Sequence, residues 1–155
     1  SLDYALSYDD KNTTALCLYA RIQAEQLFHY EEAKNYYEQA LGININAIEV
    51  YPFYIQTLLW NEDFEEAATL IDFALTVKGI NKVEILMKKI QFLELKNEFK
   101  AAKKILKELQ LLVVSNEYTY YLEETKKRIN EKLALLKPKK KKGKKSKKDK
   151  KKKGC

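Results

Sequence analysis

The side chains that most often carry chemistry are scarce in this chain. It holds one histidine, His29, and two cysteines, Cys17 and Cys155. A histidine needs partners to act as a base or a ligand, and a lone histidine in a turn is more often structural or solvated. Cys17 falls in an apolar stretch, where a thiol packs rather than reacts. The chain also lacks a glycine-rich phosphate loop and any His, Cys or carboxylate spacing typical of a metal site, so we expect no enzyme, no cofactor and no metal centre.

Paired glutamates are the remaining candidates for acid–base chemistry. The pairs are Glu31/Glu32, Glu65/Glu66 and Glu123/Glu124. They recur with a repeat described below and fall at predicted exposed helix starts, where a negative charge favours the helix dipole. We therefore interpret them as structural.

Charge is distributed very unevenly. Lys137–Lys153 contains thirteen lysines and a single acid, Asp149, so this tail carries +12 and the rest of the chain −5. Apart from Pro138, two glycines and Cys155 the tail has no apolar residue, so we expect 137–155 to be disordered.

The lysines of this tail can bind phosphates without reading sequence, as in RNA, ribosomes or DNA, and they would equally be drawn to anionic lipid or acidic proteins. A solubilising extension is the third alternative. The tail lysines we expect to meet a polyanion are Lys139, Lys140, Lys141, Lys142, Lys144, Lys145, Lys147 and Lys148.

Composition narrows the class of protein. A chain of 155 residues with 46% hydrophobic content is long enough for one domain with a core. Four glycines and two prolines are too few for the turns of an all-β domain. No apolar run is long enough to span a membrane, and no charged-then-apolar leader opens the chain. Two cysteines do not make a disulfide framework, so we expect a reducing, cytoplasmic location.

An internal repeat predicts the fold. Tyr30–Ala33, Phe64–Ala67 and Phe99–Ala102 align with spacings of 34 and 35 residues. Each alanine is followed by apolar residues four and seven positions later, which is one face of an α-helix. These residues are Tyr37 and Ala40, Ile71 and Ala74, and Leu106 and Leu109. The recurring small alanine indicates a close approach of another helix.

Each of these helices has a predicted partner upstream, over residues 14–27, 48–60 and 83–95. Their apolar stripes are Leu16, Cys17, Ala20, Ala24 and Leu27; Tyr51, Tyr54, Ile55, Leu58 and Leu59; and Val83, Leu86, Ile90 and Leu93. Asn46 and Asn81 stand three residues before Glu49 and Glu84, the spacing of a capping box. Gly42 and Gly79 are expected to end the preceding helices. The unit is therefore a helix, a tight turn and a second helix.

This unit resembles the tetratricopeptide repeat family over roughly 14–114. The resemblance implies an all-α, TPR-like α-solenoid of antiparallel helical hairpins, with units at about 13–46, 47–81 and 82–116. Residues 1–10 match the second helix of an earlier unit, whose exposed apolar side would permit self-association. Residues 117–136 form a predicted C-terminal capping helix that completes a repeat domain at 1–136. Its inner stripe is Tyr118, Tyr121, Leu122, Thr125, Ile129, Leu133 and Leu136.

The resemblance also implies a site. In the family, the first helices of successive units line a concave groove that takes a peptide or a partner's helix. By repeat position, the groove here consists of Leu18, Ile22, Gln26, Gln56, Trp60, Met87, Gln91 and Glu94. The positions comparable to the basic clamp of chaperone-tail binders are Leu18, Ile22, Phe53 and Glu84, so we expect no binding of that kind.

We therefore expect a non-enzymatic scaffold that binds a segment of a partner protein in the groove. The alternative is an RNA- or ribosome-associated factor that attaches through the polylysine tail.

Overall fold

The structure is a computed structural model that describes residues 9–137, with side chains from Asn12 onward. The predicted all-α class is confirmed for this part of the chain, which contains helices and connecting turns and no strand. None of the described helices is both long and apolar enough to cross a membrane. The tail lysines from Lys139 to Lys148, and residues 1–8 of the predicted half unit, lie outside the described residues.

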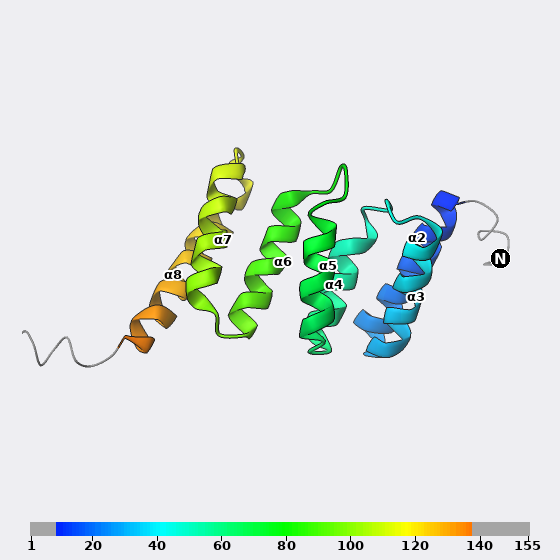
Figure 1. Ribbon diagram of the computed structural model, residues 1–155, viewed down its shortest axis with the longest axis horizontal. Helices are drawn as coiled ribbons and strands as arrows, with labels where there is room; N and C mark the ends of the chain where they lie inside the picture. The colour runs from blue at the N-terminus through cyan, green and yellow to red at the C-terminus, as the bar shows by residue number, and fades with distance from the viewer. Residues whose placement is uncertain (1–8, 138–155) are drawn as a thin grey trace, which may run out of the picture.

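Within residues 9–137, seven α-helices follow one another along a row (Figure 1). In chain order they are α2 (Asp9–Arg21), α3 (Tyr30–Ile43), α4 (Val50–Trp60), α5 (Phe64–Ala74), α6 (Lys82–Leu95), α7 (Phe99–Leu112) and α8 (Thr119–Leu136). A π-helical turn, η1 (Ile22–Gln26), extends α2, and a 3₁₀ turn, η2 (Asn116–Tyr118), precedes α8. Each helix packs on the next in sequence, and α4 also contacts both α2 and α6. The result is an elongated stack of antiparallel hairpins.

The tight turns inside the three hairpins share a left-handed residue, whereas the hydrogen bond that closes the first turn, from the amide of His29 to the carbonyl of Gln23, spans one residue more than in the other two. Phe28, Glu62 and Asn97 all adopt left-handed backbone angles, with φ values of 57°, 56° and 58°. At the second turn, the amide of Asp63 donates to the carbonyl of Leu58 at 2.9 Å, and Glu98 and Leu93 make the same bond at 2.8 Å in the third. This pattern closes a helix by satisfying its last carbonyls. The next helix then starts at once, since the carbonyls of His29, Asp63 and Glu98 each accept from the amide four residues on.

Small residues let the helices approach one another closely. Ala33, Ala67 and Ala102 are fully buried, as the repeat predicts. The apolar residues four and seven positions after them are buried as well. A larger side chain here would force the helices apart, because protein interiors are close-packed.

The core divides into two clusters. The first core cluster joins α2, α3, α4 and α5 with the beginning of α6, and includes Tyr37, Ile55 and Ile71. The second core cluster joins α6, α7 and α8, and includes Leu109 and Ile129. Leu75 and Phe92 pack against both clusters and connect them.

Several local predictions about helix ends are wrong. Asn46 does not cap α4, which begins at Val50; instead the side chain of Asn44 accepts from the amide of Asn46 in a local turn. Gly42 does not end α3, which continues to Ile43. Asn81 does cap α6 as predicted, accepting from the amide of Glu84 at 3.3 Å. Gly79 has a φ of 85° but lies in the turns beyond α5, which ends at Ala74.

The predicted apolar stripes are also wrong at two helix ends. Leu27 and Leu136 are exposed rather than buried, because each falls at or beyond the last turn of its helix. Glu123 and Glu124 lie in the second turn of α8, not at its start, because α8 begins at Thr119. Asp9 and Asp10 belong to α2, so this helix begins inside the predicted half unit 1–10.

Candidate partner-binding face

The predicted groove residues share one side of the first helices of the hairpins. On α4, Tyr54 and Leu58 are buried toward α3 and α5, whereas Trp60 at the end of the helix is exposed. The same division holds on α2, where Leu16 and Ala20 are buried and Leu18 is exposed. We call the eight predicted residues and their immediate neighbours the α2/α4/α6 face.

The part of this face on α2 and α4 exposes large apolar side chains. Leu18 is 54% exposed, Ile22 40% and Trp60 46%. Trp60 is not loose, since its ring lies 6.3 Å from that of Tyr30 at the start of α3. Apolar side chains held in place and still open to solvent are suited to burial against a partner.

The π-helical turn repositions the end of α2. In η1 the amide of Leu27 donates to the carbonyl of Ile22, a bond that spans five residues instead of four. The additional residue per turn rotates Ile22 and Gln26 relative to a regular helix. No residue pattern in the sequence predicted this change, and Gln26 is fully open to solvent as a result of lying near the helix end.

Two cations on this face were missed by the sequence prediction. The ammonium of Lys88 on α6 donates to the amide oxygen of Gln56 on α4 at 2.6 Å. The guanidinium of Arg21 on α2 lies over the ring of Phe53 on α4, 4.1 Å from its centre, and pairs with Glu25 at 3.3 Å. Both cations therefore bridge consecutive hairpins. Repeat position alone could not predict Lys88 and Arg21, because the family pattern specifies the buried positions and not the positions of these two cations.

Lys88 has an unusual environment for a lysine. Burial lowers the pKa of its ammonium, and Glu84 on the same helix partly opposes that shift. In the described part of the chain it forms no ion pair within 4 Å and its hydrogen-bond partner, the Gln56 amide, is neutral. A half-buried cation held by a neutral group retains an unmet preference for an anion.

At the other end of the face, α8 closes over the predicted groove. Met87, Lys88, Gln91 and Glu94 line a hollow of about 250 Å³ together with Tyr121 and Arg128 of α8. Arg128 donates two hydrogen bonds to the Glu94 carboxylate, at 2.7 and 2.9 Å. The hydrogen bond that Arg128 donates to Glu94 is the main cause of the raised pKa of Arg128. Glu94 is thus committed to an internal contact, and the open part of the face runs from α2 to Gln91.

The other chemistry-bearing residues are accounted for by packing or by local contacts. Cys17 is buried in the first core cluster, and burial raises the pKa of its thiol to about 11. Nδ1 of His29 lies 3.1 Å from the side-chain oxygen of Gln23 at the surface. Glu31 and Glu66 both bind Lys34, which also binds Asp63. Among the described residues no group of three or more His, Cys, Asp or Glu side chains is placed to hold a metal ion.

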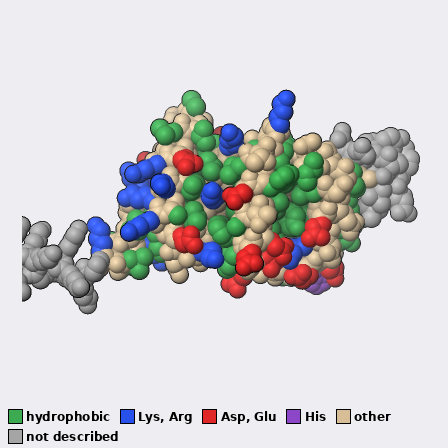
Figure 2. Space-filling view, viewed as in Figure 1, with side chains coloured by type: hydrophobic (Ala, Val, Ile, Leu, Met, Phe, Trp, Pro, Cys, Tyr) green, Lys and Arg blue, Asp and Glu red, His purple; other side chains and the backbone are tan. Residues whose placement is uncertain are grey.

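The surface charge changes sign along the row. Residues 9–74, the first half, contain twelve acids and three bases, a formal charge of −9. Residues 75–136, the second half, contain eight acids and thirteen bases, a formal charge of +5. Figure 2 shows carboxylates gathered at the lower right, on the side where α3 and α5 begin, and cations at the left, on the side of α7 and α8.

Comparisons with protein-family models, with curated proteins and with solved structures give no match to this chain.

Proposed function

We propose that this chain is a non-enzymatic, TPR-like scaffold whose α2/α4/α6 face binds a segment of a partner protein. The threefold recurrence of the left-handed turn at the sequence period, and the contacts of α4 with both α2 and α6, support the repeat architecture. Such stacks present a continuous surface made of equivalent helices.

The observation that carries the proposal is the half-buried Lys88 between Gln56 and Gln91. A partner carboxylate placed there would pair with the ammonium in a partly desolvated site, where charged hydrogen bonds are strong. The amides of Gln56 and Gln91 can donate to backbone carbonyls of the same segment. Apolar side chains of the partner would cover Leu18, Ile22 and Trp60. The segment we expect therefore combines one acidic group with apolar residues on one side of it.

The test separates binding from folding. Lys88→Met removes the cation that burial disfavours, so the free energy of unfolding should stay equal or rise slightly, while partner binding falls by about 1.5–3 kcal/mol. Lys89→Met is the matched control on the neighbouring position. The measurement is capture of the partner by each variant, with thermal unfolding recorded in parallel.

A photo-crosslinking amino acid identifies the surface directly. Placed at Leu18 or Gln91, it should attach to one peptide of the partner, and placed at the exposed Leu111 of α7 it should not. Equal crosslinking from all three positions, or equal capture by Lys88→Met and Lys89→Met, would contradict the proposal.

A second candidate function follows from the charge of the second half. Its +5 continues directly into the thirteen lysines of Lys137–Lys153, which together favour attachment to RNA or to a ribosome. Binding of a homopolymeric RNA should then be steeply salt-dependent and should be lost when residues 138–155 are removed, while the Lys88-dependent capture persists. RNA binding that survives this deletion would contradict attachment through the tail.

A further inference from the structure

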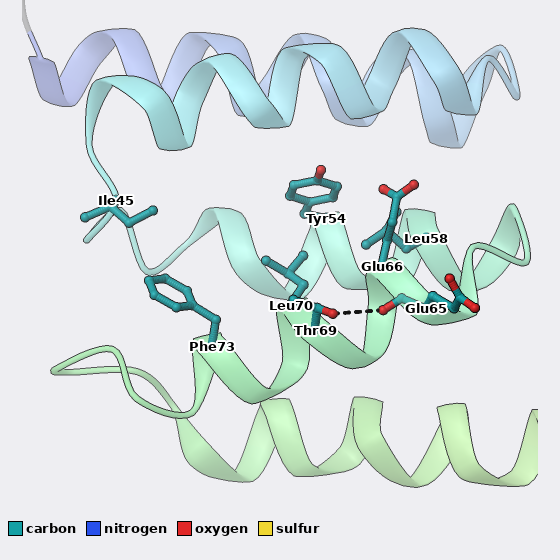
Figure 3. A pocket seen from close by; sticks show the side chains of 8 residues that line it. All are labelled: Ile45, Tyr54, Leu58, Glu65, Glu66, Thr69, Leu70 and Phe73. Carbon is teal, nitrogen blue, oxygen red and sulfur yellow. Dashed lines mark hydrogen bonds between the residues drawn. The ribbon is translucent and has the colours of Figure 1, made fainter.

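A second groove lies on the opposite side of α4 from the α2/α4/α6 face. It lies between α5 and the chain that follows α3 at Ile45, has a volume of about 600 Å³, and has Tyr54 and Leu58 of α4 as its floor (Figure 3); we call it the α3/α5 groove. The proposed function makes no use of it. Its lining residues are Ile45, Tyr54, Leu58, Glu65, Glu66, Thr69, Leu70 and Phe73.

The two ends of this α3/α5 groove differ in chemistry. At one end Ile45 and Phe73 expose apolar surface, and at the other end Glu65 and Glu66 carry the charge (Figure 3). The apolar end is held in shape, because the Tyr51 hydroxyl donates to the carbonyl of Ile45 and the Tyr51 ring packs on Phe73 at 6.1 Å. A ligand for this groove needs an apolar part followed by a cationic part.

The acidic end keeps a net negative charge. Lys34 binds Glu66 and Asp63, but it supplies one positive charge to a region that also contains Glu65 and Glu38. The Glu38 carboxylate has only the hydroxyl of Tyr54, at 3.3 Å, among the contacts found in residues 12–137. Further cations are therefore attracted to this end.

The end of α8 has the complementary sequence. Leu135 and Leu136 are 80% and 66% exposed, an unusual amount for two adjacent leucines in a helix. They are followed by Lys137, Pro138 and four consecutive lysines at 139–142. Residues 135–142 therefore contain an apolar pair next to a dense positive charge, which are the two properties that the two ends of the groove require.

The dimensions agree as well. Glu65 and Phe73 are eight residues apart on α5, so the two ends of the groove are separated by about 12 Å along the helix. Three to four residues span roughly 10–14 Å when extended, so an extended chain bound in the groove would place Lys139 or Lys140 that far from Leu136. If Leu135 and Leu136 packed on Phe73, Lys139 or Lys140 would therefore lie beside Glu65.

We infer that the α3/α5 groove binds the segment 135–142 of a second copy of this chain. The same copy cannot supply it, because Leu135 and Leu136 are fixed at the end of α8, which packs on α7, and α7 and α8 lie at the far end of the row from α3 (Figure 1). The contact joins two different surfaces, so each added copy leaves one groove and one helix end open. Contacts of this kind build chains of copies rather than closed dimers.

Two variants block the two surfaces separately. Thr69→Arg places a large cation in the middle of the groove from an exposed position of α5, with no loss of core packing. Leu135→Ser/Leu136→Ser removes the apolar pair. The matched controls are Thr119→Arg, at an exposed threonine of α8, and Leu111→Ser/Val114→Ser, which removes two equally exposed apolar side chains elsewhere.

Sedimentation equilibrium of the full chain at low salt, from micromolar to millimolar concentration, tests the inference. The wild type and both controls should form species larger than dimers, and each blocking variant should weaken association by at least about tenfold. Added salt should weaken wild-type association, because lysine–glutamate contacts near the surface are screened.

Mixing the two blocked proteins is the decisive step. Thr69→Arg keeps a normal helix end and the double serine variant keeps a normal groove, so their mixture should form a one-to-one dimer and nothing larger. A monomeric wild type overturns the inference, as does a monomeric mixture. Association that Thr69→Arg abolishes and the double serine variant retains would also overturn it, because the groove would then bind something other than this segment.

Discussion

The two halves of the stack are built from the same hairpin and carry opposite charge. Both halves bury alanine at the same place in the repeat, at Ala33 and Ala67 in the first and at Ala102 in the second. The two halves differ in charge, because the first carries a formal charge of −9 and the second a formal charge of +5. Packing restricts the residues between helices and leaves the outer positions free, so a repeat can keep its architecture while its surfaces acquire different partners.

The halves also differ in how a charged residue connects neighbouring hairpins. In the first half, Lys34 of α3 is buried and reaches Asp63 and Glu66 across to the next hairpin at 3.1 and 3.2 Å. In the second, Arg128 of α8 reaches Glu94 at the surface. The side chain of Lys34 is 10% exposed and that of Arg128 48%, so the contacts of Lys34 are less screened by solvent and should cost more to break. The comparison therefore predicts a graded series of mutational effects.

The largest effects should come from the two core clusters. Ile55→Ala in the first and Ile129→Ala in the second each remove a fully buried side chain, and each should lower the free energy of unfolding by about 2–5 kcal/mol. Urea denaturation followed by circular dichroism measures this loss. Leu111→Ala, at an exposed position, is the control and should change it by less than about 0.5 kcal/mol.

Hydrogen exchange shows whether the clusters open separately. Ile129→Ala should lower the protection of amides in α7 and α8 more than in α2 and α3, since Leu75 and Phe92, which connect the two clusters, are only partly buried. An equal loss of protection along the whole stack would mean that the two clusters unfold as one unit.

The Lys34 cluster should come next in size. Lys34→Met keeps the stem of the side chain and leaves Asp63 and Glu66 without their cation, which should cost about 1–3 kcal/mol. Desolvation lowers the pKa of Lys34 and the hydrogen bonds to Asp63 and Glu66 raise it, with a raised pKa as the net result. The contribution of its charge is therefore complete below the ordinary pKa of 10.5 and is lost as the pH rises above it. Lys100→Met on the surface of α7 is the control, and an equal loss in both variants would contradict this account.

Alkaline pH should affect the first half more than the second. Burial raises the pKa of Cys17 to about 11 and of Tyr37 to about 12, and it also raises the pKa of Tyr51 and Tyr54. Tyr121 is the corresponding group in the second half. A raised pKa means that folding favours the neutral form, so this stability is complete below pH 9 and declines as the pH rises through the shifted values.

Cys17→Ala isolates one part of this decline. Between pH 8 and pH 10 the variant should lose about 1 kcal/mol less stability than the wild type, because it has no thiol that ionises in the unfolded chain while staying neutral in the core. The measurement is the urea midpoint at each pH. Identical pH dependence in the two proteins would show that folding does not raise the pKa of the Cys17 thiol.

Sequence reasoning predicted the helices and the buried alanines because both follow from periodicity, which the chain repeats three times. It failed where a single local contact decides the outcome. Asn46 had the spacing of a cap, but the loop turns on Asn44 instead. The pairing of Gln56 with Lys88 joins residues 32 apart, which do not occupy equivalent repeat positions, so no pattern signalled it. Leu136 fitted an apolar stripe by spacing alone, but it lines an open hollow beside the start of α7 and is 66% exposed.

The smallest effect should come from the exposed pair between α8 and α6. Arg128 is about half exposed, so Arg128→Gln should lower the free energy of unfolding by less than about 1 kcal/mol, and high salt should reduce that difference further. Lys34→Met should keep most of its effect in salt, because the Lys34 side chain is only 10% exposed. Lys126→Gln on the outer side of α8 is the control for charge alone. If Arg128→Gln proved as costly as Lys34→Met, the contrast between a buried and a surface cation would have to be abandoned.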